Sequence, residues 1–365
     1  MANIIIYDIA ADSYGALVIL NQIVREAEHD KANDYYIFLS SGINKTHGNL
    51  HYIYIKKKKG LVHRIMWDSY GLKRYLKKNL IIPNLIISMQ NIALLGFHGI
   101  PQMVYLHQSV PFSDFSLNPM KKEERKLFFY KYVYKIMIFL TINFTGSRVY
   151  VQTEWMKERA VSLFRKSIKV KKIAPCIEKH EGIRNTETNN KYILFYPTSN
   201  FKYKNIDTII KAIDYLKVYN PGIYERIELQ LTIDKDLKYC AVSDKIKFIG
   251  YQSKDDMISL YENSSAMVFP SYLESFGLPL IEAASLGLPI IVSDLPYARE
   301  ILGTYDGAKF INDYLSKRAW AQGITEVYTE VYKEGRNRYE PLIWNNEGWK
   351  VLFNDIHSIL NNKKG

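Results

Sequence analysis

The sequence predicts an α/β protein with two doubly wound, Rossmann-like domains. Short apolar runs alternate along the chain with longer amphipathic stretches, which is the order expected of parallel strands joined by helices. The 365 residues are enough for two hydrophobic cores. Near the middle, residues 178–191 are polar and have the composition of a linker.

The first half opens with an apolar strand. The N-terminal run has no basic region and turns acidic at Asp8, so we interpret it as a first strand and not a signal peptide. A loop is expected at residues 8–15. Strands are predicted at 3–7, 35–39, 52–55, 85–88, 102–106 and 148–153, helices at 16–28 and 61–79, and a last strand at 173–177.

The second half repeats this alternation. Strands are predicted at 192–196, 229–233 and 247–249, and helices at 206–216, 254–262 and 344–360. We therefore expect a first domain at residues 1–177 and a second at residues 191–343.

The most informative stretch is residues 267–303. An apolar run ends at Pro270, a loop follows, and Pro279 opens an alanine-containing helical stretch that Gly287 closes. A second apolar run follows at 289–292. Proline at a helix start and glycine just past its end are typical boundaries, so this stretch predicts a strand, loop, helix and strand.

Two carboxylates flank the turn before this helix. Glu274 lies in the loop, and Glu282 lies eight residues on, in the expected first turn. The amides around Phe276, Gly277 and Leu278 would form an anion site at the helix start, with Gly277 allowing close approach. A diphosphate would bind to these amides. Glu274 would accept hydrogen bonds from sugar hydroxyls, and Glu282 would accept them from a ribose. The alternative is an ordinary βαβ unit with two solvated glutamates.

The run Glu274-Ser275-Phe276-Gly277-Leu278-Pro-Leu-Ile-Glu282 closely resembles the signature of the retaining GT-B glycosyltransferases of group 1, or family-four type. The following GLPIIVSD at 287–294 also matches. The resemblance implies that the two domains face each other across a cleft. The donor would bind the second domain and the acceptor mainly the first, and a last helix, 344–365, would pack back on the first domain.

The resemblance also assigns roles to residues outside this stretch. Lys204 matches a lysine that neutralises the donor diphosphate, although a solvated lysine in a helix's first turn is the alternative. His107 follows a strand and would face the sugar, the alternative being a histidine that only caps the strand. Together with Glu274 these are the expected catalytic residues. The expected donor-binding residues are Glu282, Phe276, Gly277, Leu278, Ser275, Gly250, Tyr251, Lys202, Ser199 and Gly15.

The chain departs from the family pattern at two places. The first loop, which is glycine-rich in the family, keeps only Gly15. Thr198 and Ser199 stand where an arginine usually precedes the lysine, and Lys202 is the candidate substitute.

No cofactor and no metal are expected. Asp234 and Asp236 form a D-x-D pair of the kind that binds Mg²⁺ or Mn²⁺ against a diphosphate, but that motif belongs to a different glycosyltransferase fold. Two cysteines, Cys176 and Cys240, indicate a reducing compartment.

The formal charge of +12 suits anionic partners. No recognisable nucleic-acid module is present, so we expect a sugar nucleotide and an anionic membrane surface and no nucleic acid. Residues 127–144 are apolar but interrupted by Lys131 and Lys135, which argues against a spanning helix. They form either a helix packed in the first domain or a surface touching anionic lipid headgroups. The basic clusters are Lys56 to Lys59, Lys73, Arg74, Lys77, Lys78, Lys121, Lys122, Arg125 and Lys126.

These observations together predict a cytoplasmic hexosyltransferase with peripheral contact to the inner face of the plasma membrane. It would move a hexose from a UDP- or GDP-linked donor to a saccharide acceptor, lipid-linked, in bacterial O-antigen, capsule or exopolysaccharide synthesis. The alternatives are a noncatalytic carbohydrate- or nucleotide-binding protein and a sugar-nucleotide epimerase of the same fold.

Overall fold

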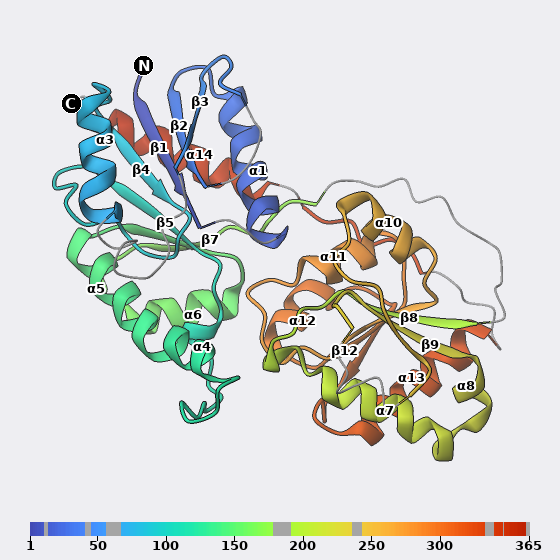
Figure 1. Ribbon diagram of the computed structural model, residues 1–365. Coiled ribbons are helices and arrows are strands. Elements are labelled where there is room, and N and C mark those ends of the chain that lie inside the picture. The colour runs from blue at the N-terminus through green and yellow to red at the C-terminus, as the bar shows by residue number, and fades with distance from the viewer. Residues whose placement is uncertain are drawn as a thin grey trace. The chain divides into compact units, whose positions relative to one another are not determined.

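The computed structural model describes residues 1–10, 14–40, 45–55, 67–177, 191–235, 243–332, 339–345 and 347–362. The chain divides into two compact units, Met1–Cys176 with Asn345–Gly365, and Ile177–Trp344 (Figure 1). Each unit holds one parallel sheet with helices on both faces, which confirms the predicted fold class. Residues 178–190 of the predicted linker lie outside the described residues.

The first unit has a seven-stranded sheet in the order β3-β2-β1-β4-β5-β6-β7. The predicted strand at 173–177 is wrong. The sheet ends earlier: the N–H of Ile173 donates to the Val151 carbonyl (2.8 Å), and Pro175, without an N–H, cannot extend the ladder. The strands are β1 Asn3–Asp8, β2 Asp34–Leu39, β3 Leu50–Tyr54, β4 Leu85–Ser88, β5 Gln102–Leu106, β6 Arg148–Val151 and β7 Val170–Lys172.

Side chains alternate between two helical layers along these strands. Tyr105 and Tyr150 face the last helix: the Tyr105 ring lies 5.3 Å from that of Trp349, and the Tyr150 hydroxyl donates to Asp355 (2.8 Å). Their neighbours, among them Val104, join a buried cluster with helices α5 (Lys135–Thr145) and α6 (Glu154–Leu163). The helices are α1 Tyr14–His29, η1 Trp67–Gly71, α3 Leu72–Lys78, η2 Val110–Phe112, α4 Arg125–Phe128, η3 Phe129–Tyr134, α5 Lys135–Thr145, α6 Glu154–Leu163 and α14 Gly348–Asn361.

The second unit has a six-stranded sheet in the order β10-β9-β8-β11-β12-β13. Its strands are β8 Tyr192–Tyr196, β9 Ile227–Leu231, β10 Ile246–Phe248, β11 Ala266–Phe269, β12 Ile290–Ser293 and β13 Ala308–Ile311. Within β8, Tyr192 packs on Tyr328 of helix α13 (Lys317–Tyr332), and Phe195 packs on Tyr261 of helix α10 (Lys254–Glu262). These two helices therefore cover opposite faces of the sheet.

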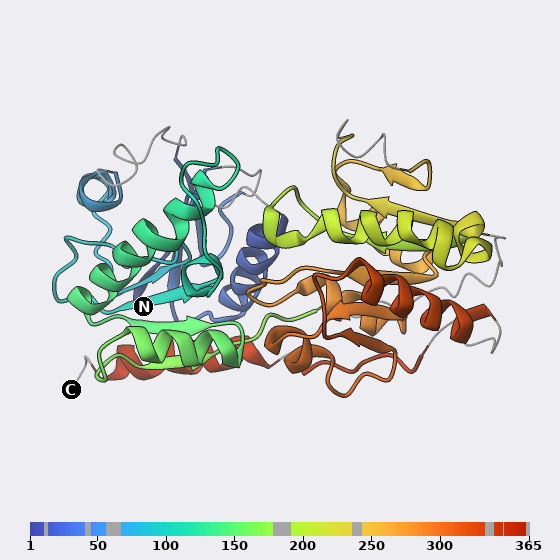
Figure 2. The same ribbon diagram turned by 90° about the horizontal axis from the view of Figure 1, so that it is seen from below.

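The helices of the second unit complete the two layers. Helices α7 and α13 lie side by side in both views (Figures 1 and 2). The helical elements are η4 Lys202–Lys204, α7 Ile206–Tyr219, α8 Pro221–Arg226, α10 Lys254–Glu262, α11 Leu278–Ser285, α12 Pro296–Leu302 and α13 Lys317–Tyr332.

Candidate functional site

The candidate site lies at the carboxyl edge of the second sheet. Strands β8 and β11 are neighbours there, and the strand order runs away from them in both directions. Ligands of open α/β sheets bind outside the carboxyl ends of the strands at such a switch point. Lys204 follows β8 and Glu274 follows β11, so parallel pairing alone brings these two loops together.

An ion pair joins the two loops. The Nζ of Lys204 lies 2.6 Å from Oε1 of Glu274, and each side chain is only 14% exposed. The lysine ammonium also lies 5.6 Å from the centre of the Phe269 ring and 5.7 Å from that of Tyr203, within cation–π range. Lys204 is therefore not a solvated lysine in a helix's first turn. It belongs to the separate turn η4, which precedes α7.

Buried tyrosine hydroxyls fix the backbone around this pair. The hydroxyl of Tyr196 donates to the Lys204 carbonyl (2.6 Å) and lies 3.1 Å from Ser271 Oγ. The Tyr297 hydroxyl donates to the Ser271 carbonyl (2.7 Å). Burial and the nearby Glu274 raise the pKa of Tyr203, as they do that of Tyr297, so both phenols stay protonated at neutral pH.

The turn before α11 holds the residues that were predicted to form an anion site. Gly277 has φ +97°, a left-handed conformation that a residue with a Cβ rarely adopts, and it caps the helix. Phe276 is buried and packs on Trp344, with ring centroids 5.6 Å apart. The amides of Phe276, Gly277 and Leu278 precede the first helical hydrogen bonds, at the positive end of the helix dipole.

Glu282 is the fifth residue of α11 and not the fourth, because the helix begins at Leu278, one residue before the predicted start at Pro279. Its Oε2 accepts a hydrogen bond from the hydroxyl of Tyr261 (2.9 Å), a residue that is 1% exposed on α10. This contact holds the carboxylate in one orientation. Nothing in their local sequence sets Tyr261, Tyr196 and Tyr203 apart among 29 tyrosines, so they were not predicted as site residues.

The remaining donor-side residues lie on neighbouring loops. Gly250 follows β10 with φ +70°, and its N–H donates to the Ile233 carbonyl (3.2 Å). Tyr251 is 78% exposed beside it. Ser199 and Ser275 are half-buried and Lys202 is exposed.

The uncharged residues Thr198 and Ser199 stand where the resembled family usually has an arginine. The N–H of Thr198 donates to Thr232 Oγ1 (2.7 Å), and the hydroxyl of Thr232 donates to the Thr198 carbonyl (3.0 Å). Of the D-x-D pair, Asp234 is described and Asp236 lies outside the described residues, as does Cys240. Among the residues that the structure describes, no three His, Cys, Asp or Glu side chains are placed to share a metal ion.

Two predicted site residues belong to the first unit. His107 follows β5, and its N–H donates to Oδ1 of Asn91 (2.7 Å). Burial lowers the pKa of His107 to about 4, so the imidazole is neutral at physiological pH. Gly15 was expected in a loop, but helix α1 already begins at Tyr14, and apart from its chain neighbours and its own helix backbone no described atom lies within 4 Å of a Cβ built on Gly15.

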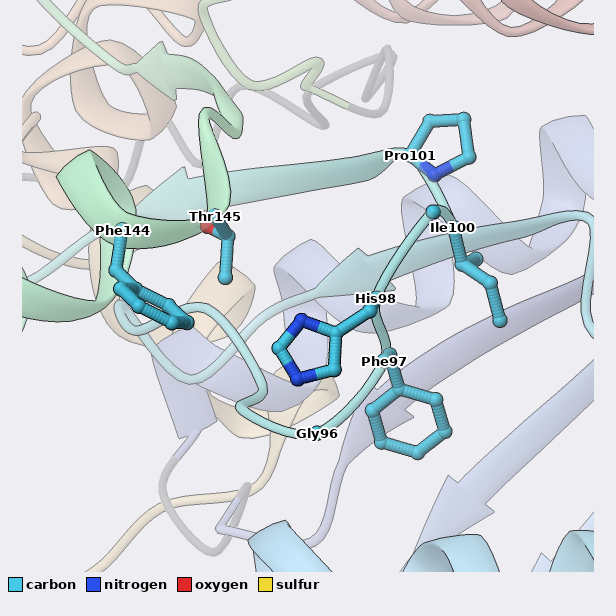
Figure 3. Close-up of a pocket in the computed structure, with 8 residues that line it drawn as sticks. Gly96, Phe97, His98, Ile100, Pro101, Phe144 and Thr145 are labelled. Atoms are coloured by element: carbon cyan, nitrogen blue, oxygen red, sulfur yellow. The ribbon is translucent and has the colours of Figure 1, made fainter.

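A pocket of about 400 Å³ lies elsewhere, at the amino edge of the first sheet (Figure 3). It is formed by the loop before β5, with His98 and Phe97, and by Phe144 and Thr145 at the end of α5. None of the predicted site residues lines this pocket. Ligands of open parallel sheets bind at the carboxyl edge, and this pocket lies at the opposite, amino edge.

The chain resembles known proteins in sequence and in fold. Residues 178–340 match the family described as "Glycosyl transferases group 1". The chain is 29% identical over 168 residues to the O-antigen chain mannosyltransferase RfbU of Salmonella typhimurium strain LT2. That match covers 44% of this chain and 45% of RfbU, so the chain spans about half the length of this curated relative.

Solved structures share the fold over nearly the whole chain. WaaG, a glycosyltransferase involved in lipopolysaccharide biosynthesis, aligns with a TM-score of 0.69 at 13% identity, over 99% of this chain and 98% of that one. Anabaena Alr3699/HepE, solved in complex with UDP and glucose, aligns with a TM-score of 0.66 at 12% identity, over 98% and 100%.

Proposed function

Because residues 178–340 match the group 1 glycosyltransferases, we propose that the chain moves a hexose from a UDP- or GDP-linked donor to a saccharide acceptor. The observation that carries this proposal is the half-buried Lys204–Glu274 pair beside the start of α11. A cation, a carboxylate and a helix N-terminus within one sheet edge suit a diphosphate joined to a sugar.

Each part of the donor has a residue of matching chemistry. The diphosphate lies on the amides of Phe276, Gly277 and Leu278, and Lys204 neutralises it. Glu274 accepts hydrogen bonds from the sugar, and Glu282, held by Tyr261, accepts them from the ribose. Gly250 and Tyr251 lie against the base. Lysine and amides supply the positive charge, so the reaction needs no metal ion.

The reaction retains the anomeric configuration. The bond between the anomeric carbon and the phosphate oxygen breaks, and the acceptor oxygen attacks the same carbon from the same face. The acceptor proton passes to the departing phosphate, which acts as the base. Negative charge grows on that phosphate in the transition state, where Lys204 and the α11 amides stabilise it. Neutral His107 serves as a hydrogen-bonding group to the sugar or acceptor and does not act as a cation.

The acceptor is a lipid-linked saccharide of bacterial surface polysaccharide, which the enzyme binds at the cytoplasmic side of the membrane. The printed name of RfbU, a mannosyltransferase of the O-antigen chain, supports this class and makes mannose the first hexose to test. The UDP and glucose bound to HepE support a nucleoside diphosphate sugar as the donor class.

The test measures release of nucleoside diphosphate from a panel of sugar nucleotides with lipid-linked acceptor. We expect one donor to be turned over, and Lys204→Met to lower kcat about 10²- to 10³-fold, as loss of a charge stabiliser does. Lys211→Met, on an exposed part of α7, is the matched control. Equal rates for both variants would contradict the assignment.

Two other outcomes identify the alternatives. Donor binding without turnover would indicate a noncatalytic binding protein. Conversion of the donor sugar without any acceptor would indicate an epimerase.

A further inference from the structure

The helical segment Arg125–Thr145 exposes an apolar face. Among the described residues it is the one helix long and apolar enough to cross a membrane, yet only 33% of its apolar window is buried. It runs through α4, η3 and α5 without a break. The exposed members recur at three- and four-residue intervals and are between 37% and 70% exposed: Tyr132, Val133, Ile136, Phe139, Leu140 and Phe144. These six residues are called the apolar face below.

The opposite side of the segment is part of the first unit's core. Tyr134, Ile138 and Ile142 pack in the cluster that includes strands β5 and β6. Lys131 also turns inward, and its ammonium donates to the Phe115 carbonyl and lies 5.2 Å from the centre of the Phe115 ring. A helix that shares one side with a sheet and points a lysine inward cannot be surrounded by lipid, so the segment does not span a bilayer.

Basic side chains lie at the amino end of the segment. Exposed Lys121, Lys122, Arg125 and Lys126 outnumber Glu123 and the buried Glu124. The Nε of Arg125 donates to the Pro119 carbonyl (3.2 Å), but cations at the start of a helix oppose its dipole, so the charges of Arg125 and Lys126 do not stabilise the helix. An apolar stripe next to basic groups matches the boundary between acyl chains and anionic headgroups.

We propose that the apolar face and these four basic residues dock the first unit on an anionic lipid bilayer, with the segment lying in the plane of the membrane. The aromatic members, Tyr132, Phe139 and Phe144, suit the headgroup level, where amphipathic rings gather. Ile136 and Leu140 enter the acyl boundary. The docking uses no part of the donor site, so it stands or falls separately from the proposed transfer reaction.

The test is co-sedimentation of the full chain with vesicles of phosphatidylcholine alone or with about one third phosphatidylglycerol. We expect binding to the anionic vesicles only, weakened by salt. Ile136→Gln/Leu140→Gln should lower the affinity at least about tenfold, since two buried apolar side chains are lost. Lys122→Gln/Arg125→Gln/Lys126→Gln should lower it more, at roughly fivefold for each charge.

Matched controls exchange exposed residues of the second unit. Val218→Gln/Leu315→Gln and Lys211→Gln should leave vesicle binding unchanged. Unaltered thermal unfolding of the face variants shows that they are folded.

Four outcomes would overturn the proposal. They are equal binding to neutral vesicles, no binding to either kind, bound protein that resists an alkaline wash as a spanning helix does, and a lipid-free dimer that Ile136→Gln/Leu140→Gln dissociates. The last would assign the face to a second copy of the chain.

Discussion

Removing one partner of the Lys204–Glu274 pair should cost nearly as much stability as removing both. The atoms are 2.6 Å apart and both side chains are 14% exposed. At that separation Coulomb's law gives about 6 kcal/mol for an effective dielectric constant of about 20, and about 1.6 kcal/mol in bulk water. Lost hydration offsets part of this attraction, so we expect a coupling free energy of about 2 kcal/mol between the two side chains.

A double-mutant cycle measures this coupling. Lys204→Met and Glu274→Gln are made singly and together, and the free energy of unfolding is taken from urea denaturation of the full chain. Each single variant should lose about 2 kcal/mol or more, and the double variant should lose less than the sum of the two. Additive losses, with a coupling below about 0.5 kcal/mol, would refute the assignment of a half-buried ion pair.

Three further perturbations test other parts of the structure. Tyr261→Phe should weaken donor binding about fivefold in calorimetry, because it removes the hydroxyl that orients Glu282 but keeps the ring against Phe195; unchanged affinity would exclude that role. The pKa of His107 is about 4 in the folded protein and about 6.5 in the unfolded chain. The free energy of unfolding should therefore fall by about 3 kcal/mol at most as the pH drops from 6.5 to 4. His107→Gln should remove this pH dependence. Gly348→Ala should lower Tm by several degrees, because its Cβ would lie 2.3 Å from the Ala174 carbonyl oxygen, whereas Gly15→Ala, whose Cβ would meet no other element among the described residues, should not.

The elements that sequence analysis located well have local boundary signals. Helix α11 begins next to Pro279 and ends just before Gly287, whose φ is +71°, so backbone restrictions set both limits. The predicted helix at 61–79 is helical from Trp67, where a π-helical turn leads into α3, to Lys78, and its earlier part lies outside the described residues.

The candidate site was predictable as a set of residues but not as a set of contacts. Glu274 and Glu282 are recognised from the short signature that holds them. The partner of Glu274 lies 70 residues earlier, and only the adjacency of β8 and β11 brings Lys204 to it. Tyr261 reaches Glu282 in the same way, from a different helix. Such partners follow from the order of strands in the sheet, which periodicity along the chain does not specify.

We assign sugar-nucleotide binding to the carboxyl edge of the second sheet. Thermal unfolding with a panel of sugar nucleotides tests this assignment, on the wild type, Glu282→Ala and the exposed control Glu225→Ala. One donor, at a hundredfold excess over its dissociation constant, should stabilise the wild type and the control by about 2.7 kcal/mol, and Glu282→Ala much less. Absence of stabilisation by every sugar nucleotide, or equal stabilisation of all three proteins, would contradict the assignment.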